Sequence, residues 1–272
     1  MDFVYRLLLC LVHFVYWCCE SMAFLCFLAR KKCDLFWTRT DLAEQITQVA
    51  SCVKQLKNVP SHLAFLLVEE NVVSVHDLAN VVIWSFAAGI SFITFYDHDG
   101  KIKMCEKRLM QELSSKAGSK IFNNILWDTI SSTNGHSDVS NGNGCTNGLS
   151  NGLSSHKLRV NLMSYEDGRP KIIRAAVELG LREKMGNSKR QERLSVNEAD
   201  EVIRAVYQSQ FGSMPDPELA VWCGSTPCLA GFLPWHTSLT EFLQLQSHHG
   251  LNSSDFLNLM ARYNKCEQRF GK

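Results

Sequence analysis

The chain has 272 residues, of which 46% are hydrophobic, and its formal net charge at pH 7 is +1. This length suits one folded domain with appendages, and the hydrophobic fraction is enough to bury a substantial core. A charge near neutrality, without a basic stripe interleaved with aromatic residues, argues against nucleic acid as a partner.

The first thirty residues differ in composition from the rest of the chain. Residues 3–29 are almost wholly apolar and are followed by Arg30, Lys31 and Lys32. A bilayer span needs about 20 apolar residues, and we find no small-residue cleavage site of a signal peptide. We therefore expect residues 1–33 to be a membrane anchor, as a single transmembrane helix. The basic residues that follow it predict that the folded part faces the cytosol.

Three ionisable residues, Arg6, His13 and Glu20, interrupt this apolar run at intervals of seven. This spacing places them on one stripe of a helix. In one interpretation, Arg6 and Glu20 reach toward opposite interfaces around a short span. In the others, the stripe is a polar seam against a partner helix, or the helix lies in the plane of the interface.

The next part of the chain alternates between strand and helix patterns. Residues 40–56 predict an amphipathic helix, residues 62–68 a buried strand, residues 75–88 a helix ended by Gly89, and residues 90–96 a second strand. Two strands joined by a helix form a parallel βαβ unit with a right-handed crossover. The fold class is therefore α/β.

A low-complexity segment of Asn, Gly and Ser covers residues 131–156 and predicts a disordered insertion. Apolar residues on both sides of it, at 123–130 and 157–164, predict strands of one sheet, so we expect a single domain over residues 37–272. Further helices are predicted at 167–184 and 198–208. A last helix starts near Ser253 or Ser254, with Phe256, Met260 and Tyr263 on one face.

The segment 216–236 has the sequence DPELAVWCGSTPCLAGFLPWH. Residues 219–223 predict a buried strand, and residues 224–233 a loop. The sequence Ser238–Glu241 resembles a capping box and predicts a helix after Pro234. Ligands of open α/β sheets bind at the carboxyl ends of the strands, so this loop is the expected site. It contains no Arg, Lys, Asp or Glu, although an anionic substrate needs cationic groups, a metal or oriented backbone N–H groups.

This pattern resembles the cis-prenyltransferase family, whose corresponding segment reads roughly I-R-T-S-G-E-x-R-x-S-x-F-L-x-W. The apolar frame is present, but Trp222 and Cys228 stand at the two arginine positions, and Thr226 at that of the metal-binding glutamate. His62 and Ala64 match the opening motif of the family, and Val68 aligns with its catalytic aspartate. The chain is similar to the non-catalytic, Nogo-B receptor-like accessory subunits of dehydrodolichyl diphosphate synthase.

Four acidic residues, Glu69, Glu70, Asp97 and Asp99, follow the first two strands. Such a cluster is either a metal site or, more commonly, a set of solvated loop acids. The chain ends with Arg269 and Gly271, which match the Arg-x-Gly tail of the accessory subunits. The resemblance implies that this tail contacts isopentenyl diphosphate in the partner's site, where arginine offers a fork of N–H donors and glycine allows close approach.

The resemblance implies a parallel sheet of about six strands surrounded by helices, preceded by the transmembrane helix. It implies a non-catalytic subunit that is inactive alone, in a heterodimer or higher heteromer with a catalytic cis-prenyltransferase. That complex elongates farnesyl diphosphate with isopentenyl diphosphate for dolichol synthesis and protein glycosylation. Mg²⁺ belongs to the partner, and the expected location is the endoplasmic reticulum membrane. The alternative is a membrane-anchored receptor or scaffold with a relict prenyltransferase fold, while a self-sufficient homodimeric synthase conflicts with Val68, Trp222 and Cys228.

Overall fold

The structure is a computed structural model that describes residues 2–37, 41–70, 72–127, 156–185 and 195–266. It divides into two compact units, residues 1–41 and 42–272. In the first unit, residues Asp2–Trp37 form the helix α1. Among the described residues, no helix combines the length and hydropathy that crossing a bilayer requires. The transmembrane anchor therefore stays a prediction.

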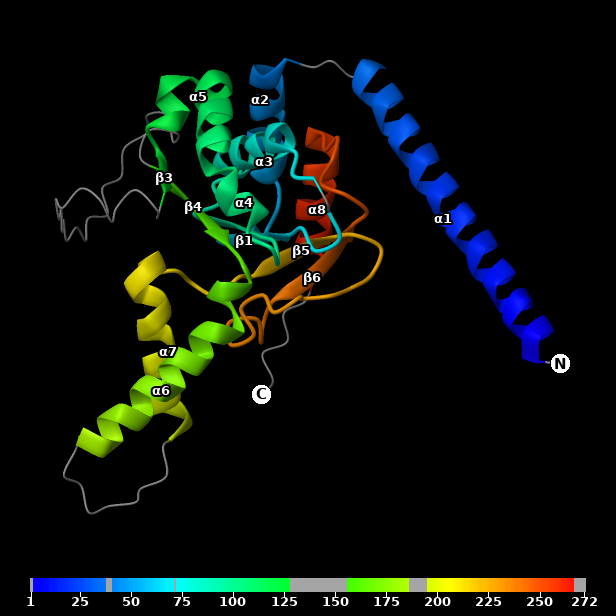
Figure 1. Ribbon diagram of the computed structural model, residues 1–272. Coiled ribbons are helices and arrows are strands. Elements are labelled where there is room, and N and C mark those ends of the chain that lie inside the picture. Colours follow the sequence, from blue (N-terminus) through cyan, green and yellow to red (C-terminus); the bar gives the residue numbers. More distant parts are fainter. Residues whose placement is uncertain (1, 38–40, 71, 128–155, 186–194, 267–272) are drawn as a thin grey trace. The chain divides into compact units, whose positions relative to one another are not determined.

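In the second unit, the described residues form one parallel sheet of six strands in the order β3-β4-β2-β1-β5-β6 (Figure 1). This confirms the expected parallel sheet of about six strands. The strands are β1 (His62–Leu66), β2 (Phe92–Tyr96), β3 (Ile125–Trp127), β4 (Leu158–Met163), β5 (Leu219–Cys223) and β6 (Glu241–Leu245). Strand β1 lies at the centre, where Leu63 aligns with Ile93 of β2 and Leu219 of β5.

Helices cover both faces of this sheet (Figure 1). Side chains of β1 alternate between the two faces, so that Leu63 and Phe65 enter the larger core and Ala64 and Leu66 the smaller one. The larger core is closed by α2 (Leu42–Val53), α3 (Val75–Ala87), α5 (Glu106–Phe122) and α8 (Ser253–Asn264), and the smaller one by α6 (Arg169–Met185) and α7 (Val196–Phe211). Burial on both faces explains the continuous apolar run of residues 62–68.

The helix ends follow the local signals in the sequence. Gly89 has a φ of +79° directly after α3, where a residue with a side chain is strained. Ser195 and Glu198 form a capping box at the start of α7. Asn252, which belongs to a glycosylation sequon, caps α8 by accepting a hydrogen bond from the Asp255 N–H over 2.8 Å. Among the described residues, the two shortest helices are α4 (Lys101–Met104) and the 3₁₀ helix η2 (Tyr165–Asp167).

The predicted helix after Pro234, with its capping box at Ser238–Glu241, is wrong. Residues 241–245 form β6 and pair with β5. The Thr240 hydroxyl donates a hydrogen bond to the Pro217 carbonyl over 2.6 Å, which ties the segment to the start of β5. The exposed edge of β5 provides backbone partners that outweigh a local capping signal, because unpaired buried backbone groups are costly.

Residues 131–155 of the predicted Asn/Gly/Ser insertion lie outside the described residues, but a strand is described on each side of it. Strand β3 precedes it, β4 follows it, and the two strands pair in parallel with Ile125 opposite Leu158. The sheet therefore contains residues from both sides of the insertion, as the sequence predicted.

Candidate functional site

The candidate site lies at the carboxyl edge of the sheet, where β1, β2 and β5 end side by side. Strand β1 leads into Val68 and Glu69, β2 into Asp97, and β5 into the loop 224–236. Because β1 pairs with both β2 and β5, the loops that follow these three strands are neighbours.

Apolar side chains occupy two positions where the family carries charged residues. Val68 and Trp222 are partly buried and pack against the smaller core, near Leu66, Ala220 and Phe232. The Trp222 ring lies 6.3 Å from that of Phe242, and its indole N–H has no hydrogen-bond partner among the described residues. These side chains extend the core into the place of a phosphate-binding pocket.

The loop after β5 binds an anion that the chain itself provides. The Glu69 carboxylate accepts hydrogen bonds from the Ser225 N–H at 2.7 Å, the Ser225 hydroxyl at 3.1 Å and the Thr226 N–H at 3.0 Å. A partial loss of hydration opposes the ionisation of the exposed Glu69, but the hydrogen bonds from Thr226 and Ser225 outweigh it and lower the pKa of this carboxyl. Thr226 thus contributes its backbone to an anion site while it lacks the metal-binding carboxylate of the family.

The remainder of this loop crosses the ends of β2 and β4. The Tyr96 hydroxyl donates to the Ala230 carbonyl over 2.6 Å, and Ala230 has a φ of +46°, an uncommon value for a residue with a side chain. A Cβ added to Gly168 would lie 2.1 Å from the Gly231 carbonyl oxygen, so the two glycines allow the loops to touch. Cys228 is exposed and accepts a hydrogen bond from the Ala230 N–H over 3.3 Å.

The four acidic residues after β1 and β2 each have partners of their own. Asp97 accepts from the Lys101 and Ile102 N–H groups at 2.7 and 2.9 Å, and Asp99 pairs with Lys101 at 2.9 Å. Glu70 accepts from the Ser247 hydroxyl at 2.6 Å and the His248 N–H at 3.1 Å. With Val68 at the aspartate position and Glu69 bound to the β5 loop, this pocket does not fit the Mg²⁺ that the family uses.

Glu70, His248 and His249 also bring three potential metal-ligand atoms within 4.8 Å of one another. The ring nitrogens argue against a metal here. The Ser74 N–H donates to Nε2 of His248 over 2.8 Å, so the proton of the neutral ring is on Nδ1, which lies 3.2 Å from the Glu70 carboxylate. Metal-bound histidines instead donate from their second nitrogen to an acceptor. We interpret the cluster as a structural link between the β1 and β6 loops.

A buried cation also lies beyond the end of β4, where the sequence analysis did not expect one. The Lys171 side chain is 4% exposed, its Nζ lies 3.5 Å from the Asp167 carboxylate, and Lys103 pairs with the same carboxylate. Burial lowers the pKa of Lys171 to about 8, although Asp167 partly opposes this. Its Nζ also lies 4.1 Å from the centre of the Phe211 ring. The charge of Lys171 is therefore satisfied within the fold.

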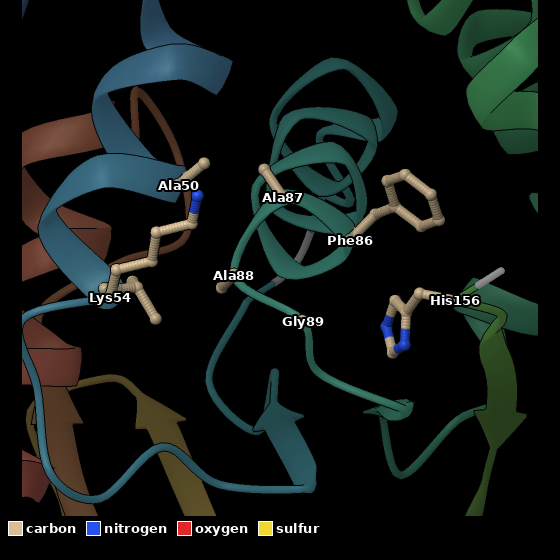
Figure 2. Close-up of a pocket in the computed structure, with 8 residues that line it drawn as sticks. Ala50, Lys54, Phe86, Ala87, Ala88, Gly89 and His156 are labelled. Carbon is tan, nitrogen blue, oxygen red and sulfur yellow. The ribbon is translucent and has the colours of Figure 1, made fainter. Parts of the chain in front are cut away.

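Two cavities lie at the opposite, amino edge of the sheet. The larger, of about 340 Å³, is bounded by Ala50 of α2 and Lys54 just after it, by Phe86 and the end of α3, and by His156 before β4 (Figure 2). The smaller, of about 270 Å³, is lined by residues 57–59, Glu218, Tyr263 and Cys266. Both lie beside residues that precede strands, so neither belongs to the carboxyl-edge site.

The predicted site residues fall into two groups. The structure brings Val68, Trp222 and Thr226 to one edge, with Cys228 in the loop that follows β5. Arg269 and Gly271 lie outside the described residues. The sequence predicted Glu69 to be a metal ligand or a solvated loop acid, and it did not reveal that this carboxylate binds the loop after β5. The small residues Gly224 and Ser225 after a buried strand were the available signal, but they do not identify the carboxylate that fills the loop.

Comparisons with known proteins identify relatives of this chain. No protein-family model matches it. The chain is 31% identical over 220 residues to the dehydrodolichyl diphosphate synthase complex subunit NUS1 of Homo sapiens, across 80% of this chain and 69% of that protein. It is 25% identical over 245 residues to the subunit of the same name from Saccharomyces cerevisiae, across 80% of this chain and 60% of that one. Lavandulyl diphosphate synthase from Lavandula x intermedia has a TM-score of 0.51 at 17% identity, over 78% of this chain and 98% of that structure.

The six-stranded parallel sheet with helices on both faces is the cis-prenyltransferase fold, and here Val68 and Trp222 at its carboxyl edge pack against the smaller core. That defines the class of the protein. The similarity in sequence then places it more narrowly: the chain belongs to the NUS1 family of dehydrodolichyl diphosphate synthase complex subunits.

Proposed function

We propose that this chain is the non-catalytic subunit of a heteromeric cis-prenyltransferase, which elongates farnesyl diphosphate with isopentenyl diphosphate in dolichol synthesis for protein glycosylation. One observation carries the proposal. At the carboxyl edge of the sheet, Val68 and Trp222 pack against the smaller core where the family has charged residues, and the N–H groups of Ser225 and Thr226 are bound to Glu69. A pocket of this kind lacks the cationic groups that phosphoryl and diphosphate chemistry requires.

The catalytic partner would hold Mg²⁺ and the allylic diphosphate in its own pocket. This chain would supply a phosphate contact in trans through Arg269 and Gly271. The position of α8 supports the proposal, because Phe256, Met260 and Tyr263 anchor this helix in the larger core up to Asn264, a few residues before the tail. A firmly packed last helix gives a short tail a fixed starting point.

The membrane is part of the proposal as well. The apolar run of residues 3–29 supports an anchor, in the endoplasmic reticulum membrane, with the folded unit in the cytosol. The product of the complex is a very long lipid, so a synthase held at the bilayer can release it without exposing it to water.

Reconstitution of the complex tests the role of the tail. The full chain is purified with the catalytic subunit, and turnover of isopentenyl diphosphate is compared with that of a chain lacking residues 269–272 and of the variant Arg269→Lys. We expect the deletion to lower turnover at least tenfold at unchanged complex yield, and Arg269→Lys to raise KM because lysine lacks the bidentate fork. Lys272→Ala is the matched control, with unchanged kinetics expected.

Three outcomes of this experiment count against the proposal. Undiminished turnover without residues 269–272 excludes the tail contact and favours the scaffold alternative. Loss of the complex itself would show that the tail serves assembly instead of substrate binding. Synthase activity of the purified chain alone would contradict the non-catalytic assignment.

A further inference from the structure

The loop after β5 has the geometry of an anion-binding nest. Two consecutive backbone N–H groups, those of Ser225 and Thr226, point at one carboxylate, and the Ser225 hydroxyl adds a third donor. Successive N–H groups that converge in this way form a concave site with a positive potential, as in phosphate-binding loops. Here the carboxylate comes from Glu69, a residue more than 150 positions away in the sequence.

The orientation of these N–H groups does not depend on Glu69. On the other side of the loop, the Gln244 side-chain amide of β6 donates to the Gly224 carbonyl at 2.9 Å and to the Ser225 carbonyl at 3.2 Å. The Gly224 N–H donates to the Leu245 carbonyl over 3.0 Å. Because peptide groups are planar, fixing these carbonyls also fixes the direction of the N–H groups that follow them. The nest is thus preformed by β6.

Gly224 shows how closely the carboxylate approaches. It has a φ of +145°, and a Cβ at this position would lie 2.6 Å from the Glu69 carboxylate. Only glycine is compatible with both this backbone conformation and this contact. Glu69 itself is exposed to solvent, so the carboxylate can leave the nest without opening the core.

We propose that residues 224–226 form a phosphate-binding nest that Glu69 occupies in cis as a displaceable plug. The ligand class of the vacated nest is a phosphate or diphosphate group, whose oxygens accept the same three donors. The plug excludes free diphosphate from this subunit. This goes beyond the proposed function, which requires only that the pocket lacks catalytic groups.

Metal-free titration with inorganic pyrophosphate tests the plug. The full-length chain in detergent is titrated by calorimetry as wild type, Glu69→Ala and the matched control Glu166→Ala. Glu166 is an exposed acid in η2, which follows β4, so its removal changes the net charge equally at the same edge. We expect Glu69→Ala to bind pyrophosphate at least tenfold more tightly than either the wild type or Glu166→Ala. Equal affinities of the two variants would overturn the proposal.

A second measurement locates the binding. With ¹⁵N-labelled serine and threonine, pyrophosphate should shift the amide resonances of Ser225 and Thr226 in Glu69→Ala and leave them unchanged in Glu166→Ala. Adding Gln244→Ala to Glu69→Ala should weaken binding severalfold, because the loop then loses the contact that orients it. Binding that shifts other resonances, or that is unaffected by Gln244→Ala, contradicts the nest. Since neither measurement involves the partner or turnover, failure here leaves the proposed function standing.

Discussion

At the scale of single residues, His62 couples the stability of the fold to pH. Its ring is fully buried at the start of β1, with Nδ1 2.7 Å from the Pro215 carbonyl and Nε2 2.8 Å from the Thr94 hydroxyl. Burial lowers the pKa of His62 to about 4, although the Pro215 hydrogen bond and Asp216 partly oppose this. The ring therefore stays neutral in the folded state over the pH range in which the unfolded chain takes up a proton.

The variant His62→Asn tests this coupling. As pH falls below 6.5, the unfolded state takes up a proton on His62 before the folded state does. The contribution of the neutral ring to the free energy of unfolding is therefore complete above pH 6.5 and is lost as pH falls toward 4. A difference of about 2.5 pKa units corresponds to about 3 kcal/mol. We expect the difference in unfolding free energy between wild type and His62→Asn to shrink by this amount between pH 7 and pH 4, measured by chemical denaturation. If the difference in unfolding free energy between the two proteins stays constant with pH, His62 does not couple stability to pH.

At the same scale, the side chains at positions 68 and 222 differ in chemistry from their counterparts in the family. Val68 and Trp222 add apolar surface to the smaller core, and Glu69 satisfies the backbone donors of the β5 loop. Restoring a charged residue at position 68 or 222 would bury that charge against Leu66 and Phe232, at a cost to stability.

At the scale of elements, α6 carries an apolar stripe that is exposed among the described residues. Ile173, Val177 and Leu181 are 63%, 58% and 53% exposed, and their spacing of four places them on one side of the helix. The opposite side packs on α7 and the smaller core through Ala175. Exposed contiguous apolar side chains commonly mark protein interfaces, and the human relative is named as the subunit of a complex. We infer that the catalytic partner covers this stripe.

Val177→Asp tests the role of α6. We expect it to lower the affinity for the catalytic subunit at least tenfold, because an aspartate in an apolar interface is left desolvated. The melting temperature of the isolated chain should change little, since position 177 is exposed. Arg174→Asp, an exposed neighbour on the same helix, is the control and should retain most of the affinity. Co-purification and quantitative pull-down measure the affinity of both variants for the catalytic subunit. An unchanged affinity of Val177→Asp would exclude the stripe from the interface.

At the scale of the whole molecule, the two units predict separable roles. Residues 42–272 contain the sheet and its described helices, whereas residues 1–41 form a compact unit of their own. All of the core residues that the sheet and helices bury belong to the second unit. The fold should therefore not depend on the N-terminal unit.

Deletion of residues 1–41 tests this separation. We expect residues 42–272 to melt cooperatively within a few degrees of the full chain and to leave the membrane fraction on cell fractionation. A second variant tests the anchor within the full chain. It replaces the apolar residues at positions 7–9 with serine, and we expect it to be released from membranes as well. A truncated chain that remains membrane-bound would place the attachment site in the folded unit.

The sequence alone determined the fold class, most element positions and the side-chain types at the positions that correspond to the family motifs. Buried strands, amphipathic helices and the residues at positions 68, 222, 226 and 228 are local features, because periodicity and side-chain chemistry are properties of short segments. The same local reasoning failed at residues 238–241. A capping signal there competes with the free edge of β5, which only the assembled sheet presents.

Tertiary structure alone decided how the acids at the carboxyl edge are used. Glu69 and Glu70 are adjacent in sequence, yet one enters the nest at Ser225 and Thr226, while the other binds Ser247 and His248. No pattern within the chain pairs residues so far apart, since the partner of a charge is set by which strand ends meet. The sequence showed that uncharged residues occupy the positions of the charged family residues at this edge. The parallel order of β1, β5 and β6 determined that the Glu69 carboxylate binds the loop after β5 in place of an external anion.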